Sequence, residues 1–136
     1  MKNYKLNFLH LCDVAILSQD NKLSVIGIFN AINLSTLPGQ LPKATLVANI
    51  GLLQESTSDL AFTLQFKAPD GKILPIAEIQ QMRPLHNAND LPIEVGFNIE
   101  LVNFTFEAAG RYMAQVLVGE ELVGEVPVEV TSMEQK

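Results

Sequence analysis

The strongest constraint on the fold is an alternation of apolar and other residues over positions 110–130. Two alternating segments are joined there by a short Gly-Glu-Glu turn. The apolar positions of the two segments are Tyr112, Ala114, Val116 and Val118, then Val126, Val128 and Val130. This pattern predicts a β-hairpin with one face turned toward a core. Because a two-stranded ribbon is barely stable alone in water, the rest of the chain must supply a second sheet to cover that face.

Further strand-like segments precede the hairpin at intervals of about 8 to 12 residues. We expect them at 6–17, 23–29, 31–37, 44–53, 60–67, 73–79 and 93–101. No window has a convincing helical period, and the chain contains no internal repeat. Short strands with turn residues between them predict an all-β fold, an antiparallel two-sheet β-sandwich of the immunoglobulin-like type. Jelly-roll or C2-like connections are the alternatives, since the sequence does not determine strand order.

Several residues sharpen this expectation. The segments 6–17 and 44–53 are apolar at both alternating sets of positions, as in a central strand covered on both faces or one that changes sheets. Gly27 indicates a bulge or a close backbone approach, and Pro75 confines its strand to a sheet edge. The Pro- and Gly-containing segment 37–42 should break the strands and lead to the other sheet. Gly110 and Tyr112 precede a long strand as in a tyrosine corner.

Length and composition indicate one domain over residues 1–136. A chain of 136 residues with 48% hydrophobic side chains buries about 65 to 70% of its unfolded surface. The single Cys12 excludes a disulfide framework and fits a reducing compartment. The apolar start is interrupted by His10, Cys12 and Asp13 without a small-residue cleavage site, and no stretch has the length of a membrane span. We therefore expect a cytoplasmic protein that does not enter a membrane.

Charge is distributed unevenly along the chain. The chain has a net charge of −6. Positions 90–136 hold nine acidic residues but only two basic ones, Arg111 and Lys136. Phosphate binding requires clustered Lys and Arg, and the sequence contains no such cluster. We expect no nucleic-acid partner.

Three segments together resemble a known family. They are Leu-Cys-Asp-Val-Ala at 11–15, Lys-Leu-Ser-Val-Ile-Gly-Ile-Phe-Asn-Ala-Ile at 22–32, and residues 106–130 with Gly-Arg-Tyr at 110–112 and Val-Gly-Glu at 118–120. They resemble an uncharacterised family of small bacterial domains that carries only a domain-of-unknown-function label. The resemblance covers nearly the whole chain. It implies a β-sandwich and supplies no activity, cofactor or site residue.

His10 and Cys12 are the first candidates for chemistry. They lie two apart on a predicted strand, so they share a face with Cα atoms about 6.6 Å apart. A nucleophilic or metal-binding pair is one interpretation; the simpler one is a small buried thiol in a packed strand. A zinc site would need four ligands, for which the chain offers no spacing. Asp13 interrupts the same apolar strand; it is either buried and paired, for example with backbone amides or Arg111, or it has a binding role.

The longest predicted loop, 80–92, collects the residue types that contact ligands or partners. We name as candidate ligand-binding or partner-binding residues Arg83, His86, Asn87, Asn89 and Asp90. The simpler interpretation is a solvated connection. A calcium site would require Asp59, Asp70 and Asp90 to converge.

The chain lacks the common enzyme signatures. It contains no Gly-x-Ser-x-Gly elbow, no phosphate-binding glycine loop and no dinucleotide fingerprint. The acidic run Glu120, Glu121, Glu125 and Glu129 is typical of a solvated edge that guards against aggregation. We expect a non-enzymatic, cofactor-free domain of unknown function that binds a protein partner, through a loop end or an exposed sheet edge, with a homodimer also open. The alternatives are a small-molecule or calcium-binding domain using 80–92, and an enzyme using an accessible Cys12.

Overall fold

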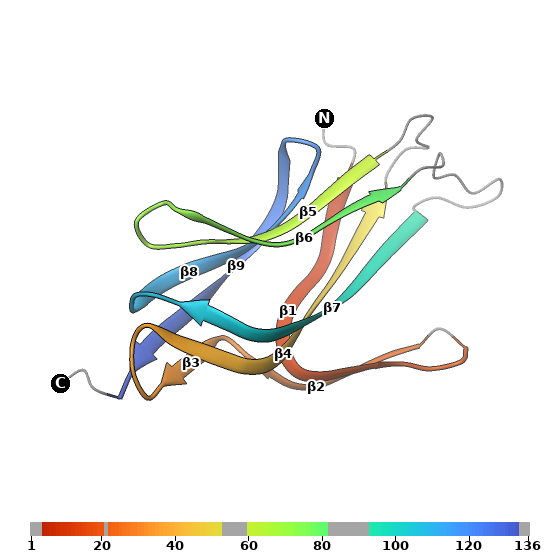
Figure 1. Cartoon of the computed structure of the whole chain (residues 1–136). Coiled ribbons are helices and arrows are strands. Elements are labelled where there is room, and N and C mark those ends of the chain that lie inside the picture. Colours follow the sequence, from red (N-terminus) through yellow and green to blue (C-terminus); the bar gives the residue numbers. More distant parts are fainter. Residues whose placement is uncertain (1–3, 21, 53–59, 82–92, 134–136) are drawn as a thin grey trace.

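The computed structural model describes residues 4–20, 22–52, 60–81 and 93–133. These ranges form nine strands and no helix (Figure 1). The strands are β1 (Tyr4–Leu17), β2 (Leu23–Phe29), β3 (Ala31–Leu34), β4 (Gly39–Leu52), β5 (Leu60–Lys67), β6 (Ile73–Gln81), β7 (Ile93–Phe106), β8 (Gly110–Val118) and β9 (Glu121–Ser132). No helix in the described ranges is long and apolar enough to cross a membrane.

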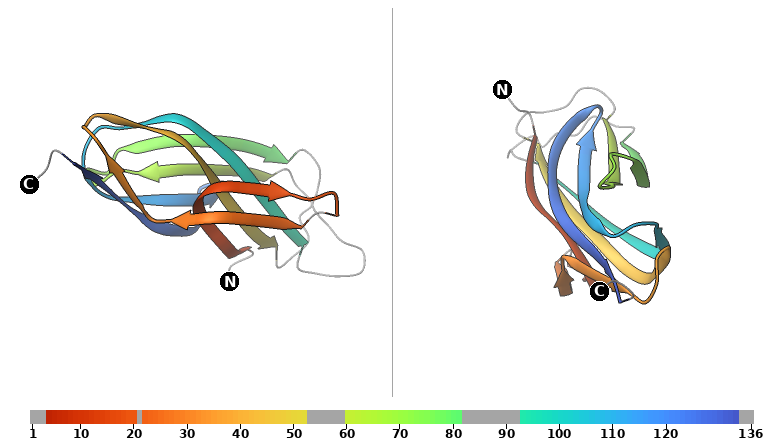
Figure 2. Two further views of the ribbon diagram at one scale, coloured as in Figure 1. Left: turned by 90° about the horizontal axis from the view of Figure 1, so that it is seen from below. Right: turned by 90° about the vertical axis from the view of Figure 1, so that its left-hand side faces the viewer.

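The strands form two sheets that face each other across the core (Figure 2). One sheet has the order β2-β1-β4-β7, and the other has the order β3-β9-β8-β5-β6. All neighbours are antiparallel except β3 and β9, which run parallel. The predicted two-sheet sandwich is confirmed.

The order of the strands is immunoglobulin-like. In that fold strands B and E are neighbours in one sheet, and C, F and G are neighbours in the other. Here β4 and β7 hold the B and E positions, while β5, β8 and β9 hold C, F and G. Strand β1 lies against β4, in the position of strand A. This order selects the immunoglobulin-like arrangement over the jelly-roll and C2-like alternatives.

The core is built from alternate residues of both sheets. The predicted inward row of β8 is buried throughout, and Val128 and Val130 of β9 are buried beside it. Aromatic rings pack in the core, most of them near the connection from β7 to β8. Their close pairs are Phe62 with Phe97, Phe66 with Phe104 and Phe106, and Phe106 with Tyr112, all at centroid distances of 5.1 to 5.6 Å. Tilted and edge-on pairs at this spacing are favourable.

The tyrosine corner is present. The Tyr112 hydroxyl donates a hydrogen bond to the carbonyl oxygen of Ala108 at 2.7 Å, four residues upstream, while its ring is buried. Burial raises the pKa of this hydroxyl, so it stays protonated as the donor. Gly110 begins the strand at a φ of 140°, with Pro69 so close that a Cβ would lie 2.6 Å from the proline ring. The corner therefore fixes how the chain passes from β7 to β8.

Two predicted boundaries are wrong in detail. The strand expected at 31–37 ends at Leu34, and the expected breaker at 37–42 already belongs to β4, which begins at Gly39. Pro42 is tolerated inside β4 because this part of the strand pairs only with β7, and the register there passes from Leu41 to Lys43. A proline on a free strand side removes no ladder hydrogen bond. The chain does change sheets here, as predicted, and Pro75 lies on the edge strand β6.

We expect the Tyr112→Phe substitution to lower the free energy of unfolding by about 1 kcal/mol. The ring and its packing are kept, but the Ala108 carbonyl loses its hydrogen-bond donor. Urea denaturation of both proteins measures the difference. An unchanged midpoint would show that this hydrogen bond does not hold the corner.

Candidate interaction surface

Strand β1 has two parts with different neighbours. From Tyr4 to Cys12 it pairs with β4, and the last of these pairs joins Cys12 to Thr45. Its pairing with β2 begins at Leu11, on the other side of the strand. Beyond Cys12 it pairs with β2 alone, ending at Leu17 opposite Leu23. The hairpin therefore leaves the sheet, and Figure 1 shows it diverging from β4 and β7. We call residues 14–20 and 22–28 the hairpin arm.

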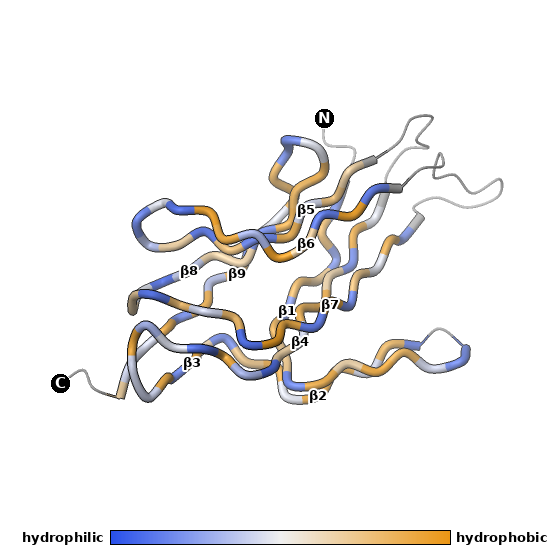
Figure 3. Tube along the Cα trace, viewed as in Figure 1, coloured by the Kyte–Doolittle hydropathy of each residue, from blue (hydrophilic) through white to orange (hydrophobic). Residues whose placement is uncertain are grey.

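One face of the hairpin arm is aliphatic and exposed. Val14 lies opposite Ile26, and Ile28 lies opposite Cys12, so these side chains share a face with Ile16. The exposed fractions of these side chains are 43% for Val14, 52% for Ile16, 54% for Ile26 and 57% for Ile28. Leu17, beside the turn, is 61% exposed. Hydrophobic colouring runs along both strands of the arm in Figure 3. Contiguous exposed apolar side chains of this kind mark interaction sites.

The other face of the arm is also apolar. Ala15 and Val25 are paired on it and half-buried, and Leu23 lies opposite Leu17. Leu17 and Leu23 line a cavity of about 580 Å³. The same cavity is also lined by Phe8 of β1, Asn49 of β4 and Asn98 of β7. The arm thus offers apolar contacts on both of its faces.

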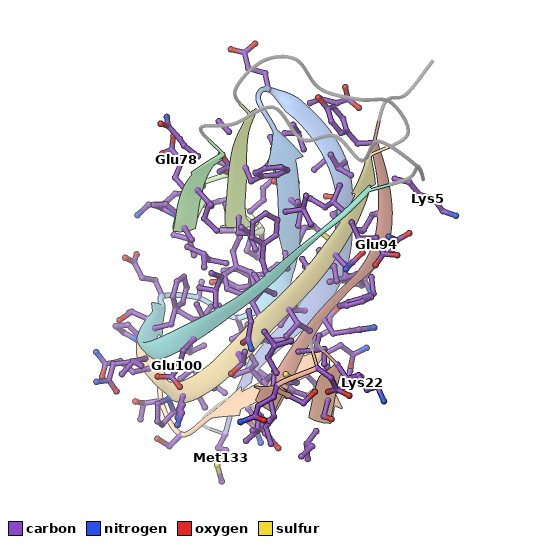
Figure 4. All side chains as sticks on the ribbon, turned by 90° about the vertical axis from the view of Figure 1, so that its right-hand side faces the viewer. Lys5, Lys22, Glu78, Glu94, Glu100 and Met133 are labelled. Carbon is purple, nitrogen blue, oxygen red and sulfur yellow. The ribbon has the colours of Figure 1, made fainter. Side chains whose placement is uncertain are left out.

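Strand β2 is the least protected of the four sheet edges. Its sequence, Leu-Ser-Val-Ile-Gly-Ile-Phe, contains no charge and no proline, and in the described part of the chain it pairs only with β1. The edge strand β6 carries Pro75 and Glu78, β7 carries Glu94 and Glu100, and β3 has only four residues. The acidic side chains of β6 and β7 are labelled in Figure 4. Charges, prolines and short length are the usual protections of an edge.

Charges at the turn of the arm offset each other. The Ser18 hydroxyl donates a hydrogen bond to the Asp20 carboxylate, and the Lys22 ammonium lies 3.4 Å from the same carboxylate. The hydrogen bond from Ser18, followed by that from Lys22, lowers the pKa of Asp20. Lys22 lies well away from Glu78 in Figure 4.

Asp13 and Gly27 mark the place where the arm leaves the sheet. Gly27 has a φ of +73°, and a Cβ there would lie 2.9 Å from Cγ of Asp13. The close approach at Gly27 is therefore that of the Asp13 side chain to the glycine backbone. The expected burial of Asp13 with Arg111 is wrong, because Asp13 is exposed and Arg111 pairs with Glu129 at 2.5 Å. A charge can stand in this apolar strand because β1 leaves the covered part of the sheet at that point.

The His10 and Cys12 side chains do not form a reactive pair. Cys12 has no exposed surface, and its thiol contacts the carbonyl oxygens of Thr45 at 3.4 Å and Val14 at 3.6 Å. Burial, and then the nearby Asp13 charge, raises the pKa of the thiol. The His10 ring stacks on Phe8 at a centroid distance of 6.1 Å. The described ranges contain no group of three or more His, Cys, Asp or Glu side chains able to hold a metal ion.

The loop predicted at 80–92 begins later than expected, because Gln80 and Gln81 belong to β6, and its remaining residues lie outside the described ranges. This applies to Arg83, His86, Asn87, Asn89 and Asp90 alike. Of the three acids proposed for calcium, only Asp70 is described, and its carboxylate accepts a hydrogen bond from the Lys72 backbone amide at 3.0 Å. Both interpretations of this loop stay predictions.

The hairpin arm was missed as a site because its pattern has two meanings. Apolar residues at both alternating sets of positions predict either a central strand covered on both faces or a strand that changes sheets. In the first part of β1, Leu9 and Leu11 face the core, while on the opposite side Cys12 is buried and Phe8 and His10 are half-buried. Beyond Cys12 the same pattern is exposed. The Asp13 charge and the positive-φ Gly27 were the available signals of the change.

The chain belongs to a family of unknown function, DUF6941, whose model matches residues 7–131. This confirms the resemblance to an uncharacterised domain family. No curated protein matches the chain.

Solved structures similar to this chain share its fold at low sequence identity. The alkylpurine DNA glycosylase AlkC of Pseudomonas fluorescens, bound to DNA with an abasic site analog, matches at 13% identity and a TM-score of 0.57, over 96% of this chain and 31% of the glycosylase. A β-glucosidase of Listeria innocua in complex with glucose matches at 12% identity and a TM-score of 0.52, over 95% and 16%. The C-terminal domain of Wzt matches at 8% identity and a TM-score of 0.51, over 100% and 83%. This chain thus spans less than a third of the two enzymes.

We expect Gly27→Ala to lower the free energy of unfolding by about 2 kcal/mol, from left-handed backbone strain and the contact with Asp13. Gly119→Ala is the control, since Gly119 has a φ of +62° with no atom near its Cβ position. Its loss should be smaller, near 1 kcal/mol. Equal losses in thermal or urea denaturation would show that the Asp13 contact is without effect.

We expect the native Cys12 thiol to react with a thiol reagent far more slowly than the thiol of the unfolded chain. The unfolded thiol ionises near its usual pKa of 9.0, whereas the folded thiol keeps its proton to higher pH. The stability from Cys12 is therefore intact below pH 9.0 and falls as the pH rises above it. A Cys12→Ala variant should lack this part of the pH dependence. Equal reaction rates in the native and unfolded states would contradict the burial.

Proposed function

We propose that this chain is a non-enzymatic, cytosolic, immunoglobulin-like domain that binds another protein chain through the hairpin arm. The observation that supports this most is the coincidence of two features on β2. It is the one uncharged, proline-free sheet edge longer than four residues in the described part of the chain, and exposed aliphatic side chains lie along it. Either feature alone is common on protein surfaces; together they match a strand-binding edge.

The backbone of β2 supplies one part of the binding energy. Its side opposite β1 carries amide and carbonyl groups that a further strand satisfies by extending the sheet. Such main-chain hydrogen bonds fix the direction and register of the added strand. Specificity then depends on the side chains that flank the edge.

The aliphatic side chains supply the other part. Full burial of an Ile or Leu side chain contributes about 1.5 to 3 kcal/mol, and the side chains of the arm are about half exposed already. Covering the rest of Ile16, Ile26 and Ile28 therefore contributes about 1 kcal/mol each. Contributions of this size are needed to offset the entropy that association costs.

The buried thiol and the ring-stacked His10 support a domain without nucleophilic chemistry. The DNA glycosylase and the β-glucosidase share only the fold with this chain, over a small part of their own length. No described residue favours calcium or a small molecule over a protein chain at the hairpin arm.

An affinity experiment tests the proposal. Two differently tagged copies of the wild-type chain are expressed together in the host, one copy is purified, and all bound chains are identified, including the second copy. Ile26→Glu places a charge on the β2 edge, and Val102→Glu places the same charge on β7, where Val102 is 60% exposed opposite Lys43. We expect a chain that stays bound to the wild type and to Val102→Glu but is lost from Ile26→Glu. Binding that persists in Ile26→Glu would place the partner elsewhere.

A further inference from the structure

We infer that the chain bound by the hairpin arm is a second copy of this protein, paired antiparallel through β2. The inference rests on the function proposed above and adds the identity of the partner. It follows from what an added strand must look like, from the symmetry of the edge and from the distribution of charge.

A strand added beside β2 must be apolar on both faces. On one face it would lie beside Ile26 and Ile28, and on the other beside Leu23 and Val25. A strand that is half polar, as on most protein surfaces, would place polar side chains against one of these rows and leave them without partners. The strand that fits has aliphatic residues at both alternating sets of positions and no charge.

Strand β2 has no charge and is apolar on both faces except at Ser24, its one polar side chain. A two-fold axis perpendicular to the sheet keeps each row of side chains on its own face. Even-numbered residues of one copy therefore face even-numbered residues of the other, and odd-numbered residues face odd-numbered ones. With the axis at Ile26, the middle residue of the strand, Ile26 lies opposite its symmetry mate and Ser24 lies opposite Ile28 of the second copy. The opposite face brings Leu23 against Phe29 of the second copy. Every position of the edge then meets an uncharged residue.

The charge distribution favours contact at the arm over contact elsewhere. Two copies of a chain with a net charge of −6 repel each other, and nine of the fifteen acids lie after residue 89. Within the arm, Asp20 and Lys22 form an ion pair and no other residue is charged. The edge strand β2 itself carries no charge, and the exposed Asp13 carboxylate beside Gly27 belongs to the next strand, β1. Contact through β7 would instead bring the Glu94 side chains of two copies to the seam, together with Glu100, which is paired with Lys43 at 3.4 Å.

The size of the arm is in keeping with a modest interface. The chain exposes 8282 Å² in total, and a standard interface covers about 800 Å² per partner. An arm of fourteen described positions with five half-exposed aliphatic side chains falls at or below that size. We therefore expect a dimer that dissociates on dilution.

Sedimentation equilibrium of the purified chain over about 1 to 100 μM tests the inference in the range where modest interfaces dissociate. We expect the wild type and Val102→Glu to move from monomer to dimer with concentration, and Ile26→Glu to stay monomeric across the range. Circular dichroism and the denaturation midpoint check that both variants fold. A folded Ile26→Glu that dimerises like the wild type would overturn the pairing through β2.

The two proposals fail in different ways. A wild type that stays monomeric throughout would overturn the second copy as partner. If the affinity experiment then shows a different protein lost only from Ile26→Glu, the arm is a binding site for that protein and the proposed function stands. If no chain depends on Ile26, both the partner and the proposed function are wrong.

Discussion

The packing of the two sheets against each other is the interaction on which the rest of the structure depends. Neither sheet has a covered face without the other, and both contribute alternate side chains to one continuous core. The rings of Phe66, Phe104, Phe106 and Tyr112 close that core at one end, and the hydroxyl of Tyr112 ties the end of the core to the backbone that precedes β8. An arm that carries exposed aliphatic residues is tolerated because the core is complete without it.

The four sheet edges show how differently one domain treats equivalent positions. Three edges are short, charged or interrupted by proline, whereas β2 is none of these. An open aliphatic edge raises the risk of aggregation unless something covers it. Its persistence beside three protected edges is what distinguishes the arm from a chance exposure of single apolar side chains.

Where a pattern had one physical meaning, the sequence was sufficient. The alternation at 110–130 and at 60–67 predicted strands with buried rows, and both are present with the expected residues inward. The tyrosine corner followed from the spacing of Gly110 and Tyr112. Where two environments fit one pattern, the sequence was not sufficient, because residues 14–28 look the same whether a further layer covers them or not. Pro42 was predicted to end a strand for a related reason. A proline removes a ladder hydrogen bond only on a side of the strand that is paired, and Pro42 lies where β4 has one free side. The candidate residues of 80–92 lie outside the described ranges, so their role stays a prediction.

The parallel pairing of β3 with β9 has a consequence for how the chain folds. It joins Ala31 to Glu129 and Ile32 to Val130, residues almost a hundred positions apart, so it forms only after a large loop has closed. The β1–β2 hairpin, in contrast, is closed by a turn of a few residues and forms on the timescale of microseconds. Non-local pairings of this kind slow the folding of β-sandwiches. The two strands of the arm can therefore pair before β3 reaches β9, but as a transient ribbon that gains its stability only when the sheets pack.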